Sequence, residues 1–192
     1  MNETIEIINT RSTLKEWLKE EKSLYLGNTR KRRIKTFLLY DHDYVIWKFV
    51  HALRICEYHY NTGHRLRYVL WQNRKNHIGA KIGITAWHNT LGKGVRFWHY
   101  GSVIINGYSK IGTGCQFHGN NCIGNKGENY IEAPVLGNRV KVGVGAKVLG
   151  NVYVADDVKI GANAVVVKSC YKKGATLVGI PAREVIKSEE RK

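Results

Sequence analysis

Residues 134–168 read PVLGNRVKVGVGAKVLGNVYVADDVKIGANAVVVK, and this stretch decides the fold because a large or branched apolar residue stands at every sixth position. The six positions are Leu136, Val142, Val148, Val154, Ile160 and Val166. A smaller or β-branched residue stands two positions before each of them, in the order Pro134, Val140, Ala146, Val152, Val158 and Ala164. An earlier tract repeats the same spacing at Ile105, Ile111, Phe117 and Ile123.

A period of six predicts a short strand and a turn on each face of a triangular prism, with three repeats in one coil and the large apolar residue pointing inward. The coils hydrogen-bond to one another, so such an array needs a cap at each end. We expect the N-terminal region to cap one end and residues 168–187 to close the other. Residues 125–133 break the period and are expected to protrude as a loop.

The region before the repeat has helical periodicity, so we divide the chain into an N-terminal helical region, 1–75, and a repeat domain with a C-terminal tail, 76–192. Thr13 and Glu16 have the spacing of a capping box for a first helix. A second helix is expected after Asp43 and a third near Thr62. Their apolar faces are predicted to contain Ile46, Phe49, Val50, Leu53 and Tyr60, and Leu66, Val69 and Leu70.

The charge balance indicates an acidic binding partner, because the sequence contains 31 lysines and arginines and only 15 acidic residues, which gives a formal charge of +16. Both halves of the chain are basic, and no nucleic-acid-binding motif is present, so nucleic acid is not expected as the partner. The densest cluster, Arg30 to Lys35, is interpreted as a solvated loop. Peripheral contact with an anionic membrane or an acidic glycan is the alternative.

Signals for export or for metal binding are not found in the sequence. No stretch resembles a signal peptide or a bilayer span, which predicts a cytoplasmic protein. The four cysteines, Cys56, Cys115, Cys122 and Cys170, have no zinc-binding spacing, so we expect free thiols and no metal.

Five motifs give the sequence a resemblance to the hexapeptide-repeat acyltransferases, and within them to the serine acetyltransferase branch and its polysaccharide-modifying relatives. The motifs are FWHYG at 97–101, KIG at 110–112, APVLG at 133–137, VGVGAKVLG at 142–150 and GIPAR at 179–183. The resemblance implies a mainly β fold, a left-handed parallel β-helix with an N-terminal α-helical cap. It also implies a homotrimer that binds acetyl-CoA, the cosubstrate, between neighbouring prisms.

The resemblance further implies direct transfer of acetyl to an alcohol, with His99 as the general base. An alcohol needs such a base near neutral pH, and imidazole has a suitable pKa. His118, one coil further on, is the second candidate. An imidazolium is stabilised by a carboxylate on its other nitrogen, and Asp43 and Glu57 are the candidates for that support.

The cosubstrate site is carried over from the resemblance by position. Small residues would let the pantetheine arm lie against the coil, and cations would meet the phosphates. The candidates are Val144, Ala146 and Ala162 for the arm, and Lys159, Lys168 and Arg183 for the phosphates.

Two departures from the serine acetyltransferase pattern concern the acceptor. Ala133 replaces a second histidine, and the position near Ile84 has no acid to orient the base. The segment Trp87 to Gly94 instead looks like relatives that acetylate sugars. A sugar hydroxyl of a surface polysaccharide is therefore the expected acceptor, and serine O-acetylation is the alternative. A γ-carbonic-anhydrase-like zinc enzyme is disfavoured because only His99 and His118 lie in well-defined coils.

Overall fold

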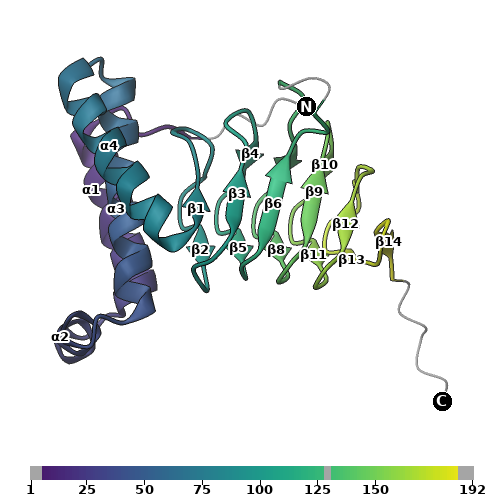
Figure 1. Ribbon diagram of the computed structural model, residues 1–192, viewed down its shortest axis with the longest axis horizontal. Helices are drawn as coiled ribbons and strands as arrows, with labels where there is room; N and C mark the ends of the chain where they lie inside the picture. Colours follow the sequence, from purple (N-terminus) through teal and green to yellow (C-terminus); the bar gives the residue numbers. More distant parts are fainter. Residues whose placement is uncertain (1–5, 128–130, 186–192) are drawn as a thin grey trace.

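A computed structural model of the protein describes residues 6–127 and 131–185. Four helices come first in the chain and stand at one end of a β-helix, whose coils stack away from them towards the C-terminus (Figure 1). The helices are α1 (Arg11–Leu26), α2 (Arg30–Leu38), α3 (His42–Asn61) and α4 (Arg65–Ile82). None of the helices in the described ranges has both the length and the apolar character that a bilayer span requires.

Three parallel sheets form the faces of the prism, and each is named here by its first strand. The β1 face contains β1 (Ile84–Thr85), β3 (Val103–Ile105), β6 (Asn121–Gly124), β9 (Lys147–Leu149) and β12 (Val165–Val166). The β4 face contains β4 (Lys110–Ile111), β7 (Val135–Leu136) and β10 (Tyr153–Val154). The β2 face contains β2 (Arg96–Phe97), β5 (Gln116–Phe117), β8 (Lys141–Val142), β11 (Lys159–Ile160), β13 (Thr176–Val178) and the antiparallel β14 (Arg183–Glu184).

The six-residue period is confirmed as the period of the faces. Lys141 pairs with Lys159 and Val135 pairs with Tyr153, so a regular coil takes eighteen residues. The predicted inward residues, from Ile105 to Val166, are all buried and form one continuous core. This apolar column is the main source of stability, since burial of each large side chain is worth about 1.5–3 kcal/mol.

Close stacking of the coils explains glycines that directly follow inward residues. A Cβ at Gly112 would lie 2.5 Å from the carbonyl oxygen of Gly137, and one at Gly143 would lie 2.7 Å from the backbone nitrogen of Ala162. Neither neighbour can move without breaking the stack. Glycine is therefore required here by the distance between successive backbones and not by an unusual φ angle.

The helices cap the open edge of the first coil with one polar side chain for each face. On the β2 face, the Tyr25 hydroxyl donates to the Val95 carbonyl and accepts from the Phe97 N–H. On the β1 face, the Lys75 ammonium donates to the Ala86 carbonyl at 2.6 Å. On the β4 face, Arg54 donates to the carbonyls of Leu91 and Gly92, in the segment after β1 that pairs with β4. The predicted role of the helical region as a cap is therefore borne out by contacts with backbone groups that would otherwise be unpaired.

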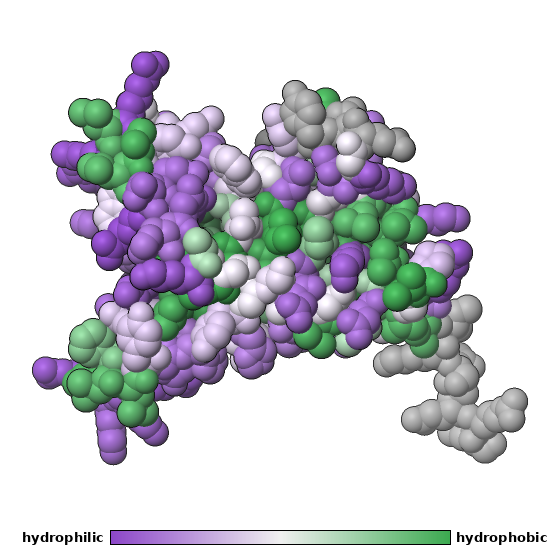
Figure 2. All heavy atoms as spheres, in the orientation of Figure 1, coloured by the Kyte–Doolittle hydropathy of each residue, from purple (hydrophilic) through white to green (hydrophobic). Residues whose placement is uncertain are grey.

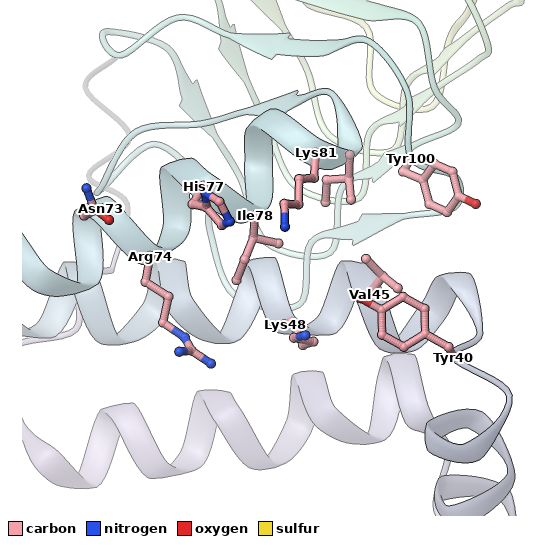
Figure 3. Close-up of a pocket in the computed structure, with 10 residues that line it drawn as sticks. Tyr40, Val45, Lys48, Asn73, Arg74, His77, Ile78, Lys81 and Tyr100 are labelled. Carbon is pink, nitrogen blue, oxygen red and sulfur yellow. The ribbon is translucent and has the colours of Figure 1, made fainter.

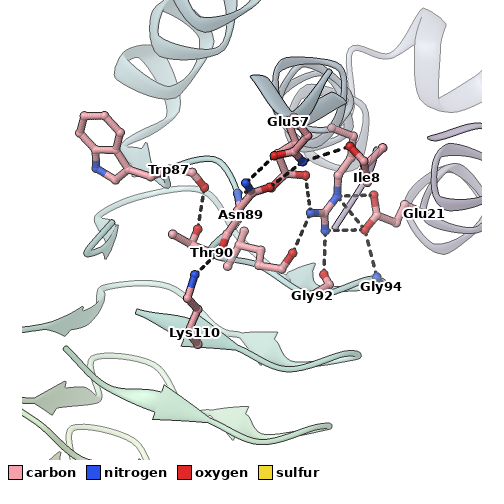
Figure 4. Close-up of polar contacts among 12 residues, drawn as sticks. Ile8, Glu21, Glu57, Trp87, Asn89, Thr90, Gly92, Gly94 and Lys110 are labelled. Carbon is pink, nitrogen blue, oxygen red and sulfur yellow. Dashed lines mark hydrogen bonds and ion pairs between the residues drawn. The ribbon is translucent and has the colours of Figure 1, made fainter. Parts of the chain in front are cut away.

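Arg54 is the centre of a buried ionic network that joins α1, α3 and the first coil (Figure 4). Its guanidinium donates to Glu21 on α1, to Glu57 on α3, and to the carbonyl oxygens of Leu91 and Gly92. All three charged side chains are at most 2% exposed. Burial raises the pKa of Glu57, and the charge of Arg54 opposes that rise.

Four sequence-based expectations about the helices need correction. The cap of α1 is Thr10, whose hydroxyl accepts from the Thr13 N–H, so Thr13 is inside the first turn and not at its start. Residues Arg30 to Lys35 form α2, capped by Thr29, instead of a loop. Helix α4 continues to Ile82, beyond the boundary drawn at residue 75, and ends where Gly83 adopts a left-handed conformation. The three apolar residues expected on its buried face, Leu66, Val69 and Leu70, are exposed.

The far end of the prism is closed as expected, because β14 turns back and pairs antiparallel with β13. The predicted loop at 125–133 falls partly outside the described residues. Its effect on the stack is nevertheless visible, since Gln116 pairs with Lys141 and Lys110 with Val135, so this coil contains seven more residues than a regular one.

We expect Arg54→Ala to reduce the free energy of unfolding by about 3–5 kcal/mol, because it leaves Glu21 and Glu57 buried without their cation. A group whose pKa is raised in the folded state loses stability as pH rises through that pKa. The deficit should therefore shrink as the pH is lowered towards 4.5. Lys93→Ala is the matched control, since its ion pairs with Glu16 and Glu20 lie nearer the surface and are worth about 0–1 kcal/mol. Denaturant unfolding at one protein concentration measures both; equal losses for the two variants would contradict the assignment.

Candidate active site

The turn between β2 and β3 is longer than the equivalent turns of the next coils. Phe97 pairs with Phe117 and Val103 pairs with Asn121, so this turn contains two more residues than the one below it. Because the strands on both sides stay in register, the extra length must project outward from the prism edge. The projecting residues, 98–102, include Trp98, His99 and Tyr100, all exposed.

His99 meets the amino-terminal end of α3 at this edge. Its ring stacks on that of His42, with ring centres 5.9 Å apart and planes inclined by 27°. His42 in turn lies 2.8 Å from the carboxylate of Asp41, which caps α3. The sequence analysis did not select His42, because nothing in the spacing between residues 42 and 99 brings them together.

Asp43, proposed as a partner of His99, is instead an ion-pair partner of Arg96. The Arg96 guanidinium lies between the rings of Tyr25 and Trp98, at 4.4 and 4.9 Å from their centres. In the part of the chain that the structure describes, no carboxylate is within ion-pair distance of His99. Asp43 therefore acts on the turn only through Arg96 and through His42, whose Nε2 lies 3.6 Å away.

Glu57 is not close to His99. It lies fourteen residues after Asp43 on the same helix, which places it about 21 Å further along the axis. It belongs to the buried Arg54 network and accepts a hydrogen bond from the Asn89 N–H. Its proposed support of the base is incompatible with this position; the sequence pattern could not show which end of α3 faces the turn.

His118 lies on the same edge, one coil further from the helices, as expected. Its ring stacks on that of Trp98 at 5.9 Å, and the Trp98 indole donates to Gln116. Burial lowers the pKa of His118, and the charges of His99 and Lys141 lower it further. The environment therefore favours a neutral His118 ring that packs beside the base.

The edge that carries His99 and His118 continues to two of the residues predicted for the pantetheine arm. Val144 and Ala162 occupy equivalent turns in the next two coils, linked by the hydrogen bond from the Asn163 N–H to the Val144 carbonyl. Both are exposed. Ala146 is fully buried and points into the core, so its side chain cannot line an outer groove. The resemblance placed Ala146 beside the arm by position, whereas the register of the coils makes its side chain internal.

The three predicted phosphate partners do not lie together. Lys159 and Arg183 are on the β2 face, in β11 and β14, whereas Lys168 follows β12 at a different edge of the prism. A cation that the sequence analysis missed, Lys141, pairs in register with Lys159 one coil nearer to His118. Lys141 and Lys159 therefore lie side by side on one face, with Arg183 beyond the intervening strand β13, and the three cations form a basic strip. The eighteen-residue spacing between Lys141 and Lys159 was the signal that could have revealed their pairing.

Residues 133–168 match the family model described as bacterial transferase hexapeptide (six repeats). This match and the stacked parallel sheets make the chain similar to the hexapeptide-repeat transferases, so the predicted resemblance is confirmed.

Within this class the chain is similar to serine acetyltransferases. It is 42% identical to the serine acetyltransferase of Helicobacter pylori strain 26695 over 112 residues, 58% of this chain and 60% of that protein. The chain thus spans about three fifths of the length of that relative. The crystal structure of Neisseria gonorrhoeae serine acetyltransferase with serine has the same fold, with a TM-score of 0.67 and 22% identity over 92% of this chain and 70% of that one. A serine acetyltransferase complex with CoA gives a TM-score of 0.70 and 24% identity over 91% and 71%.

These relatives contradict the expected sugar acceptor. The expectation relied on Ala133, on the missing acid near Ile84 and on the segment before His99, which are local differences. The similarity extends over most of the coils and is to serine acetyltransferases, so the predicted closeness to polysaccharide-modifying enzymes is wrong.

Proposed function

We propose that the protein is an acetyl-CoA-dependent O-acetyltransferase whose acceptor is the hydroxyl group of serine. The observation that carries the proposal is the single prism edge on which an exposed histidine, His99, lies in line with the exposed small residues Val144 and Ala162. Neighbouring coils are about 4.8 Å apart, so the edge from His99 to Ala162 extends about 14 Å. An extended pantetheine arm can cover that span and bring its thioester to the imidazole.

Serine as the acceptor is supported by the charges around His99. The carboxylates of Asp41 and Asp43 stand at the amino terminus of α3, next to the ring that stacks on His99. Asp43 is already paired with Arg96, so the Asp41 carboxylate is the one suited to the ammonium group of an amino acid, and the helix terminus itself favours a carboxylate. The relatives' names support the same acceptor.

The proposed mechanism is direct transfer. His99 takes the proton from the serine hydroxyl while the oxygen attacks the thioester carbonyl, and the CoA thiolate leaves. The carboxylate that usually orients such a base is replaced here by the stacked ring of His42 and the Asp41 beside it. Lys141, Lys159 and Arg183 supply positive charge for the CoA phosphates on the β2 face.

We further propose a homotrimer, in which a neighbouring prism supplies the second wall of the donor groove. Apolar side chains on the outside of the β1 face support this, because Ile104 in β3 is 48% exposed. Figure 2 shows apolar surface among the polar side chains on this side of the coils. Two exposed apolar residues, Leu38 at the end of α2 and Leu39 directly after it, follow the Arg30 to Lys35 cluster and support peripheral contact with an anionic membrane or glycan.

His99→Ala is expected to lower kcat for acetylation of L-serine about 10²- to 10⁴-fold, the usual contribution of a positioned general base. The fold should be unchanged, because His99 is exposed. His118→Ala is the control and should retain most of the activity. Release of CoA thiol with L-serine as acceptor measures both. Loss of activity in the control alone would move the base to His118, and a wild-type protein inactive with L-serine would refute the acceptor.

Arg183→Ala is expected to raise the KM for acetyl-CoA more than it lowers kcat, since a phosphate contact far from the reacting atoms binds ground and transition states equally. Initial rates over a range of acetyl-CoA concentrations measure the two constants. Lys168→Ala, which removes a cation from another edge, is the matched control. An unchanged KM for Arg183→Ala would exclude this residue from the donor site.

The protein is expected to sediment at about three times the 21.9 kDa chain mass in dilute buffer. A trimer follows if the donor groove needs two prisms. Equilibrium sedimentation at several protein concentrations checks this, and a monomer that retains full activity would overturn the proposal.

A further inference from the structure

A pocket of about 700 Å³ lies between α3 and α4 (Figure 3). Val45, Ile78 and Ile82 provide apolar surface, and the rings of Tyr40 and Tyr100 stand at one end. A volume of this size suits an organic molecule and greatly exceeds a single inorganic ion.

The charge of this pocket has one sign. Lys48 comes from α3, and Arg74 and Lys81 come from α4, with His77 between them. No aspartate or glutamate lines the pocket, and in the described ranges no carboxylate is within ion-pair distance of the three cations. Lys48 and Arg74 instead lie over aromatic rings at 5.5 to 5.7 Å.

An excess of cations alone would not define a site, because lysines and arginines outnumber acids two to one in this chain. What distinguishes this group is its convergence on a concave surface. Elsewhere on the surface, Lys93 pairs with Glu16 and Arg139 pairs with Asp157, whereas the pocket cations have no such partner among the described residues. The charge of Arg74 also acts on a neighbouring residue. Burial lowers the pKa of His51, and the charges of Arg74 and Lys22 lower it further.

We propose that this pocket binds a small organic anion with at least two negative charges, a phosphate ester or a polycarboxylate. Like charges brought together by two helices repel one another, and such an anion removes the repulsion while its organic part covers the apolar wall. The site is separate from the proposed donor strip, which lies on the β2 face of the coils.

The pocket shares two chain segments with the candidate active site. Tyr40 immediately precedes Asp41 and His42, and Tyr100 immediately follows His99. An anion that orders these two rings therefore acts on both segments that present the base. The binding proposal itself does not depend on the acceptor being serine.

Isothermal titration of the whole protein with pyrophosphate and, separately, with citrate tests the proposal. We expect one site per chain for at least one probe, with an affinity that falls as salt is raised. The variant Lys48→Gln/Arg74→Gln/Lys81→Gln should weaken that affinity at least tenfold and leave the melting temperature nearly unchanged, because these side chains make no buried hydrogen bonds. Preference for pyrophosphate indicates the phosphate class, and preference for citrate the polycarboxylate class.

The matched control is Lys159→Gln/Arg183→Gln, which removes charge from the proposed donor strip. It should leave the affinity for the probe within a factor of two. Saturating acetyl-CoA should likewise leave the probe bound. Absence of binding by the wild type, equal weakening by the control, or displacement of the probe by acetyl-CoA would each overturn the proposal.

Discussion

The structure depends on how the first coil of the β-helix is finished. Each coil uses the backbone groups of the next, so the first coil presents carbonyl and N–H groups on three faces with no strand to receive them. Tyr25, Arg54 and Lys75 each donate a hydrogen bond to a backbone carbonyl on one of these faces. Because they come from three different helices, the capping of one coil also fixes the helices relative to each other.

This docking has a consequence for the chemistry. Helix α3 is held at two points, by Arg54 in its middle and by the ion pair between Asp43 and Arg96 near its start. These contacts determine where the amino terminus of α3 lies. That terminus brings His42 onto the ring of His99. The base proposed here is thus exposed on one side and supported on the other by a residue that belongs to the cap, and the helical region contributes to the site as well as to stability.

The edge of the prism organises the rest of the site. Residues that differ by one coil lie next to each other, which aligns His99, His118, Val144 and Ala162 in consecutive turns. The face beside this edge carries Lys141 and Lys159 in the same way. A donor that is long, thin and charged at one end matches such a linear arrangement, whereas the second basic site is a pocket between α3 and α4.

The sequence by itself determined the prism, its inward residues and the presence of a cap at each end, because a six-residue period fixes which side chain faces the core. The proposal of His99 as the base came from the resemblance of the segment 97–101 and not from the period. The sequence did not determine what lies beside the base. His42, Asp43 and Glu57 are placed by the packing of α3 on the first coil, which no local sequence pattern encodes. Both carboxylates proposed as partners of His99 are paired with arginines instead, Asp43 with Arg96 and Glu57 with Arg54. The two extra residues in the turn 98–102 and the seven in the third coil change the sequence spacing between successive coils, so only the folded stack reveals which residues meet. Ala146 shows a limit of the resemblance itself: matching by position placed it beside the cosubstrate, and the tertiary structure places its side chain in the core because inward positions are set by the register of the coils.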